Sequence, residues 1–186
     1  MSSPPQGALD LSRLLLPIQP DDHAQGPPDA KYTLVEYGDY ECPDCGHLFF
    51  TIRHLRVQLG DELRLVFRHY PRSGVHPHAQ QAAEAAEAAG AQGRFWEMHD
   101  LLFANESALA TKDLYGYAEQ LSLDMQRFRD ELKHRTYENY VREDFRRGVA
   151  NGVYGTPALF INGIRDNGAL EQNSLLAQLN AKKMKP

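Results

Sequence analysis

Hydrophobic residues follow strand-like and helix-like patterns in alternation along the first half of the chain. Tyr32–Tyr37 and Leu63–Tyr70 are rich in aromatic and β-branched residues, as buried strands are. Between them, from about Pro43 to Leu59, leucine and isoleucine recur on one face of a helix, and Gly60 is a residue type that ends helices. The pattern predicts a β–α–β unit. Its strands should be parallel because such crossovers are right-handed.

From residue 78 to about residue 149 only helical patterns occur. They predict five helices: Ala79–Ala89, Phe95–Phe103, Leu114–Leu121, one with the stripe Met125, Phe128 and Leu132, and one with the stripe Tyr137, Val141 and Phe145. We interpret Gly90 as the residue that follows the first of them. Phe95, Trp96 and Met98 are expected to pack within this helical block rather than to bind a cofactor.

Strand signals return near the C-terminus. Pro157–Ile161 and Ile164–Asp166 flank Asn162-Gly163, a typical two-residue hairpin turn, and Leu170–Leu179 has the pattern of a closing helix. The predicted fold class is α/β, with an all-helical insertion (residues 78–150) between a β–α–β half (31–77) and a β–β–α half (151–186). The proline-rich residues 1–30 are expected to form an arm, with one edge strand near Leu14–Ile18.

The composition of the chain argues against two classes of partner, nucleic acid and membranes. The chain has 186 residues, a net charge of −5 and interspersed acidic and basic residues, so no basic stripe favours nucleic acid. No apolar run approaches the length of a membrane span, and we expect no membrane partner. The N-terminus lacks the basic and apolar regions of an export signal, which favours a cytoplasmic location.

The candidate chemistry lies in the two cysteines of the chain, Cys42 and Cys45. A disulfide across so short a loop stabilises a fold little, so a reactive pair is the better interpretation. With Cys42 at the N-cap and Pro43 in the first helical position, the Cys45 N–H can point at the Cys42 sulfur, and the helix dipole adds positive charge. Such positions lower a cysteine pKa from roughly 8.5 to about 3.5–7.5. We therefore expect Cys42 to be the nucleophile and Cys45 the resolving thiol.

Four further residues have predicted roles. Glu36 lies within an apolar strand, where burial raises the pKa of a carboxyl, and it is a candidate to accept the proton of Cys45; the alternative is a strand glutamate that reaches water. The Asp44 carboxylate should oppose the Cys42 thiolate weakly. Thr156-Pro157, possible as a cis bond, would leave backbone groups free to pair with an extended peptide if it faces the cysteines.

Taken together, Glu36, Cys42-Pro43-Asp44-Cys45, the helical block and Gly155-Thr156-Pro157 resemble the DsbA-like branch of the thioredoxin superfamily, especially its single-domain bacterial members. The resemblance covers roughly Asp22 to Leu179. It implies a thioredoxin fold with a helical insertion, protein thiols or disulfides as substrates, and no cofactor beyond the cysteine pair. It also implies that Cys42 is the nucleophile, Cys45 the resolving cysteine, Glu36 the buried acid and Pro157 the cis-proline. Strongly oxidising members have histidine where this chain has Asp44.

We therefore predict an enzyme that exchanges disulfides with protein substrates in the reducing or isomerising direction and is recycled by an unidentified redox partner. One alternative is a non-catalytic chaperone or adaptor of the same fold. Another is a zinc-binding domain that uses Cys42, Cys45, His76 and His78, although a His-x-His spacing suits zinc poorly. We expect no metal.

Overall fold

A five-stranded mixed sheet forms the centre of the computed structural model, which describes residues 10–182. The strands are β1 (His23–Gln25), β2 (Tyr32–Gly38), β3 (Leu63–His69), β4 (Ala158–Ile161) and β5 (Ile164–Asp166). Their order is β1-β3-β2-β4-β5, with β2 and β3 parallel and the other pairs antiparallel. The predicted parallel β–α–β unit and the Asn162-Gly163 hairpin are confirmed.

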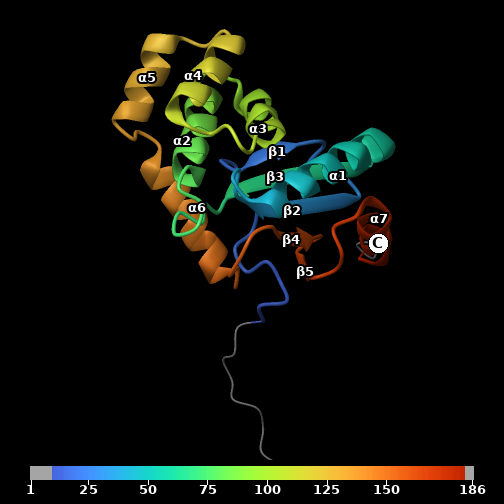
Figure 1. Cartoon of the computed structure of the whole chain (residues 1–186). Helices are drawn as coiled ribbons and strands as arrows, with labels where there is room; N and C mark the ends of the chain where they lie inside the picture. Colours follow the sequence, from blue (N-terminus) through green and yellow to red (C-terminus); the bar gives the residue numbers. More distant parts are fainter. Residues whose placement is uncertain (1–9, 183–186) are drawn as a thin grey trace, which may run out of the picture.

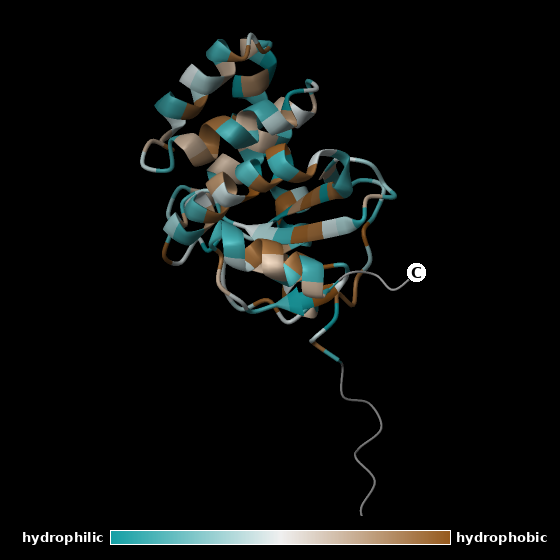
Figure 2. Cartoon of the chain, turned by 90° about the vertical axis from the view of Figure 1, so that its right-hand side faces the viewer, coloured by the Kyte–Doolittle hydropathy of each residue, from teal (hydrophilic) through white to brown (hydrophobic). Residues whose placement is uncertain are grey.

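One face of the sheet packs against α1 (Pro43–Leu59) and α7 (Gln172–Ala181). Leu48, Ile52 and Leu55 of α1 are buried, at the helical spacing that the sequence showed. Gly60 ends α1 with φ of +51°, where residues with a Cβ are disfavoured, and the short 3-10 helix η1 (Gly60–Glu62) leads into β3. Figure 2 shows hydrophobic residues both in the strands of the sheet and along the helices.

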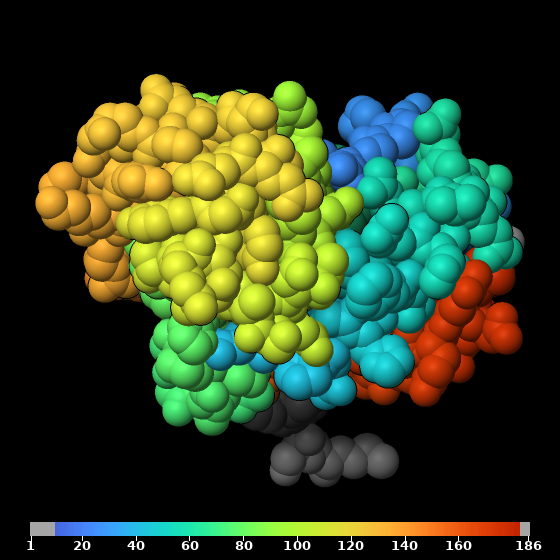
Figure 3. Space-filling model, turned by 45° about the horizontal axis from the view of Figure 1, so that its top comes forward, coloured from blue at the N-terminus to red at the C-terminus, as the bar shows by residue number. Residues whose placement is uncertain are grey.

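The helical block extends to the other side of the sheet (Figure 1). It consists of α2 (Ala79–Gly90), α3 (Phe95–Ala104), α4 (Thr111–Gln120), α5 (Met125–Lys133) and α6 (Glu138–Ala150). The small side chains of α2 are almost wholly buried, which lets α3, α4, α5 and α6 all approach it. In Figure 3 the block forms a lobe beside the lobe that contains α1. Phe95 and Met98 are buried in its core and Trp96 packs against it, as predicted.

Two local predictions were wrong. No strand forms at Leu14–Ile18; the edge strand is β1, which pairs with β3, while Leu14 and Ile18 pack on the sheet face that α6 covers. Within residues 10–22 the only strand-like pairing is an isolated bridge between Arg13 and Ile164. Gly90 is the last residue of α2 rather than the residue after it.

No helix within residues 10–182 combines the length and the hydrophobicity needed to cross a membrane. The first nine residues of the predicted N-terminal arm lie outside the described residues.

Candidate active site

The two cysteines lie at the start of α1, directly after the central strand β2. Cys42 is the N-cap, with the extended backbone angles φ −93° and ψ 117°, and Pro43 opens the helix as predicted. Cys45 lies in the first turn and is fully buried, whereas Cys42 retains 4% exposure. Both are free thiols. Cys42 is thus the sulfur nearer to solvent.

The loop before β4 completes the site because β4 runs antiparallel to β2, with Ala158 opposite Tyr37. The residues that precede β4 therefore lie at the end of the sheet where β2 leads into the cysteine motif. The Cys42 thiol donates to the carbonyl oxygen of Thr156 at 3.4 Å. The Thr156–Pro157 bond is cis.

The two thiols differ strongly in acidity. The pKa of Cys42 is lowered to about 6, chiefly by a hydrogen bond from the Cys45 thiol; the Thr156 side chain and the backbone N–H groups of Cys45 and Asp44 lower it further, against the opposing effect of burial. Burial raises the pKa of Cys45 well above its ordinary value, as do the hydrogen bond to Cys42 and the nearby charge of Glu36. At neutral pH the pair holds one thiolate, on Cys42.

The direction of this shift was expected, but its leading cause was not. The Cys45 N–H donates to the Cys42 carbonyl oxygen at 2.9 Å, and the thiol of Cys45 contributes more to the low pKa than that N–H does. Asp44 is exposed, and its backbone N–H lowers the pKa of Cys42, whereas the sequence suggested opposition from its carboxylate.

Glu36 lies in the interior of the sheet, between Phe67 of β3 and Leu159 of β4. It is 2% exposed, and its Oε1 has no hydrogen-bond partner among the described residues. Burial, together with the charge of Cys42, raises its pKa to about 8. The alternative of a glutamate that reaches water is therefore wrong, because its carboxyl is held away from solvent near the sulfurs.

Asp39 organises the turn between β2 and α1, and the sequence analysis missed it. Its carbonyl oxygen accepts the Cys42 N–H at 3.2 Å, and its carboxylate accepts the N–H groups of Glu41 and Arg72 and contacts His76 Nδ1 at 2.8 Å. An aspartate two residues before a backbone donor is a known turn signal, but its long-range partners leave no local signal.

The histidines of the zinc alternative are engaged elsewhere. His76 Nδ1 contacts Asp39, and His78 Nδ1 contacts Glu41 at 2.8 Å. Within residues 10–182 the only group with metal-ligand spacing is His23, His69 and Glu87, which includes neither cysteine. In this group both histidine Nε2 atoms lie 2.7 Å from the same Glu87 oxygen, a hydrogen-bonding distance.

The assembled groups suit sulfur exchange. A thiolate that keeps 4% exposure lies beside a fully buried thiol that can attack in turn, and a buried carboxyl with a pKa of about 8 can exchange a proton. The Thr156 carbonyl oxygen adds a backbone acceptor beside the nucleophile.

Comparisons of sequence agree with this chemistry in part. Residues 19–181 match the profile of the family described as Thioredoxin. The chain is 46% identical over 177 residues to a protein named Na(+)/H(+) antiporter NhaA 1 of Salinispora arenicola, covering 95% of this chain and 26% of that protein. A similarly named protein of Herminiimonas arsenicoxydans is 42% identical over 166 residues, with 89% and 26% covered. The chain thus spans about a quarter of the length of these curated relatives.

Solved structures share the fold at low sequence identity. Oxidised BdbD from Bacillus subtilis superposes with a TM-score of 0.73 at 21% identity, covering 85% of this chain and 90% of BdbD. A thioredoxin-like oxidoreductase from Silicibacter pomeroyi gives a TM-score of 0.72 at 24% identity, with 94% and 97% covered. The thiol-disulfide exchange protein alpha-DsbA2 from Wolbachia pipientis gives 0.73 at 20% identity, with 85% of each chain covered.

Proposed function

Because this chain belongs to the thioredoxin family and has the fold of its DsbA-like members, we propose that it is a thiol–disulfide oxidoreductase acting on protein substrates. The observation that carries the proposal is the pairing of an acidic Cys42 thiol with a buried, weakly acidic Cys45 thiol. We attribute the match to the longer antiporter-named proteins to a segment of thioredoxin type within them.

In the proposed reaction the Cys42 thiolate attacks one sulfur of a client disulfide. A Cys42–client disulfide forms, and the other client sulfur leaves as a thiolate. Once Cys42 is bound to the client, its negative charge no longer raises the pKa of Glu36. The ionised form of Glu36 then takes the proton of Cys45, and Cys45 attacks the Cys42 sulfur, which closes the Cys42–Cys45 disulfide and releases the second client thiolate. The client is reduced by two electrons, and a separate dithiol partner must reduce the enzyme again. Thr156 and Pro157 would contact the client backbone.

We further propose net reduction or isomerisation in the cytoplasm, where the thiol pool keeps dithiols reduced. The name of the antiporter relatives does not identify a client protein for disulfide exchange. We propose neither nucleic acid nor a membrane as a partner. Equilibration with glutathione tests the direction. A reduction potential of about −120 mV, as strong oxidants have, would overturn this direction.

The substitution Cys45→Ser tests the reaction itself. It should trap client proteins as disulfides of Cys42, visible as high-mass species on non-reducing gels that disappear with a reducing agent. The matched variant Cys42→Ser should trap none and should lose turnover in an insulin-reduction assay. If wild-type protein gave no turnover while Cys42→Ser still bound its clients, the chain would be a chaperone or adaptor instead.

A further inference from the structure

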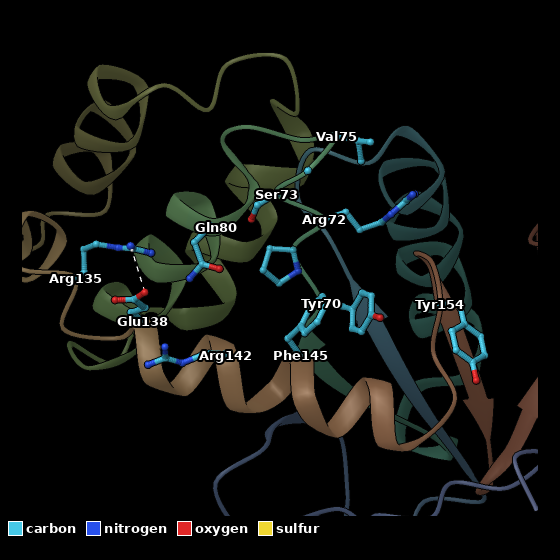
Figure 4. A pocket seen from close by; sticks show the side chains of 12 residues that line it. Tyr70, Arg72, Ser73, Val75, Gln80, Arg135, Glu138, Arg142, Phe145 and Tyr154 are labelled. Atoms are coloured by element: carbon cyan, nitrogen blue, oxygen red, sulfur yellow. Dashed lines mark ion pairs between the residues drawn. The ribbon is translucent and has the colours of Figure 1, made fainter.

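A groove with a volume of about 710 Å³ opens between the loop that follows β3 and helix α6 (Figure 4). Its size falls within the range of ligand-binding sites, and the proposed reaction does not account for it. The loop residues Tyr70–Val75 form one side, and Phe145, Arg142 and Glu138 of α6 lie on the other.

The groove is basic although the chain as a whole carries a charge of −5. Three of its side chains are arginines and one is a glutamate. Arg135 is held by Glu84 at 2.9 Å and by Glu138 at 3.3 Å, so both local carboxylates are already engaged. Within residues 10–182, Arg72 and Arg142 form no ion pair, and Arg142 donates only to the neutral Asn139. Two guanidinium groups are thus left to bind an anion.

Apolar and aromatic side chains line the same groove. Phe145 stacks on Tyr70, with ring centroids 4.3 Å apart, and the Tyr70 hydroxyl donates to the Val153 carbonyl oxygen at 2.8 Å. Val75 is 61% exposed and Tyr154 is 79% exposed, which is unusual for side chains of their size and hydrophobicity. This mixture of fixed rings and free arginines fits a peptide better than it fits a small inorganic anion.

The groove is connected to the nucleophile through the backbone. Tyr154 precedes Thr156 by two residues, so their Cα atoms are within about 8 Å of each other. The carbonyl oxygen of Thr156 accepts from the Cys42 thiol at 3.4 Å. On the opposite side, Asp39 binds the Arg72 N–H at 2.8 Å and the Cys42 N–H at 3.2 Å, which fixes the arginine loop relative to the cysteine.

We propose that this groove binds an extended segment of the client polypeptide and selects clients with acidic side chains near the reacting cysteine. The inference rests on the proposed disulfide exchange and names its substrate class. A client held as a Cys42 disulfide and lying along Thr156 would pass Tyr154 into the groove. At about 3.3 Å per residue, side chains roughly two to four positions from the client cysteine would reach Arg72 and Arg142.

Two synthetic peptides of about ten residues test this. Each carries one cysteine as a mixed disulfide with thionitrobenzoate, and they differ only in having glutamate or glutamine at the second to fourth positions on either side. Attack by Cys42 forms the Cys42–peptide disulfide and releases the coloured thiolate, whose appearance gives the rate under single-turnover conditions. At low ionic strength we expect the acidic peptide to react about tenfold faster, at the lower end of electrostatic steering effects.

That ratio should fall towards one in about 1 M salt and in the double variant Arg72→Gln/Arg142→Gln. The control Arg146→Gln should keep the wild-type ratio, because Arg146 lies on the same helix but outside the groove. If the double variant does not fold, the salt dependence of the wild-type ratio still decides.

Equal rates for the two peptides would overturn the groove assignment and leave disulfide exchange intact. If neither peptide reacted, the proposed function and the inference would fall together. The rate of reaction with glutathione disulfide is the third measurement. If the double variant reduced this rate by the same factor as the rate with the acidic peptide, the groove would be a site for small anionic thiols, and the assignment to a polypeptide would be wrong.

Discussion

Two buried glutamates, Glu36 and Glu87, behave in opposite ways. Glu36 in β2 is 2% exposed and Glu87 in α2 is 6% exposed. The pKa of Glu36 is raised to about 8, because burial disfavours its charge and its Oε1 has no partner among the described residues. Burial acts on Glu87 in the same sense, but hydrogen bonds and charges of His23 and His69 outweigh it and lower the pKa to about 2.

Partners, rather than depth, therefore decide what a buried carboxyl does. Glu87 stays ionised and links the edge strand β1, the end of β3 and helix α2 through one oxygen atom. Glu36 has no such partners within residues 10–182 and can gain or lose a proton near pH 8, beside a thiol that must lose one. The first arrangement stabilises the fold, and the second supports our assignment of Glu36 to the reaction.

The largest expected effect is on stability in Glu87→Gln. Removing the charge leaves His23 and His69 facing a neutral amide, and the free energy of unfolding at pH 7 should fall by about 4 kcal/mol. Urea denaturation measures this. The control Glu97→Gln, which breaks a pair that is about half exposed, should cost less than about 0.5 kcal/mol.

The pH dependence of that loss has a definite sign. Since the folded pKa of Glu87 is about 2 and its ordinary value is 4.5, its contribution is complete above pH 4.5 and is lost as the pH falls towards 2. The wild type and Glu87→Gln should therefore converge in acid. A constant difference from pH 7 to pH 2, or a loss no larger than that of Glu97→Gln, would contradict the account of Glu87.

Glu36→Gln should show the opposite stability profile. A carboxyl whose folded pKa is about 8 against an ordinary 4.5 destabilises the folded state progressively as the pH rises from 4.5 to 8. In a Cys42→Ser background, which removes the titration of that thiol, the substitution should raise stability at pH 9 relative to pH 4 by about 3 kcal/mol. Urea titrations at the two pH values measure this, and a pH-independent difference would show that Glu36 is not held protonated.

The same substitution, Glu36→Gln, should have a smaller effect on the rate of disulfide exchange. Glu36→Gln should slow closure of the Cys42–Cys45 disulfide about tenfold, because Cys45 loses its proton acceptor, and should leave the first attack within about twofold. Rapid quenching of single turnovers separates the two steps. Glu87→Gln, assayed where it is folded, should change neither. If Glu36→Gln left both rates unchanged, Glu36 would have no part in the mechanism.

Local signals explain why much of the fold was predictable. Pro43 at the first helical position and Gly60 at the end gave α1 its observed limits, and Asn162-Gly163 gave the hairpin. The edge strand was not predictable in the same way, since His23–Gln25 is a strand only because it pairs with β3, some forty residues away. The pattern at Leu14–Ile18 instead reflects packing on the sheet.

The site shows the same distinction between features with a local sequence signal and features that depend on long-range contacts. Spacing within one segment was enough to identify Cys42, Cys45 and their neighbour Pro43. Residue chemistry suggested the roles of Glu36 and Pro157, and the resemblance implied the same roles. The structure places Glu36 and Thr156 with the cysteines. The network of Asp39 and the arginines of the groove come from segments that meet only in the folded chain.

The rate at which iodoacetamide alkylates Cys42, measured in the reduced protein by mass spectrometry as a function of pH, tests the central claim most directly. We predict a midpoint near pH 6, because a hydrogen bond from the Cys45 thiol favours the ionised form of Cys42 and lowers its pKa. A midpoint at or above about 8.5, the value of an unperturbed cysteine, would contradict the account.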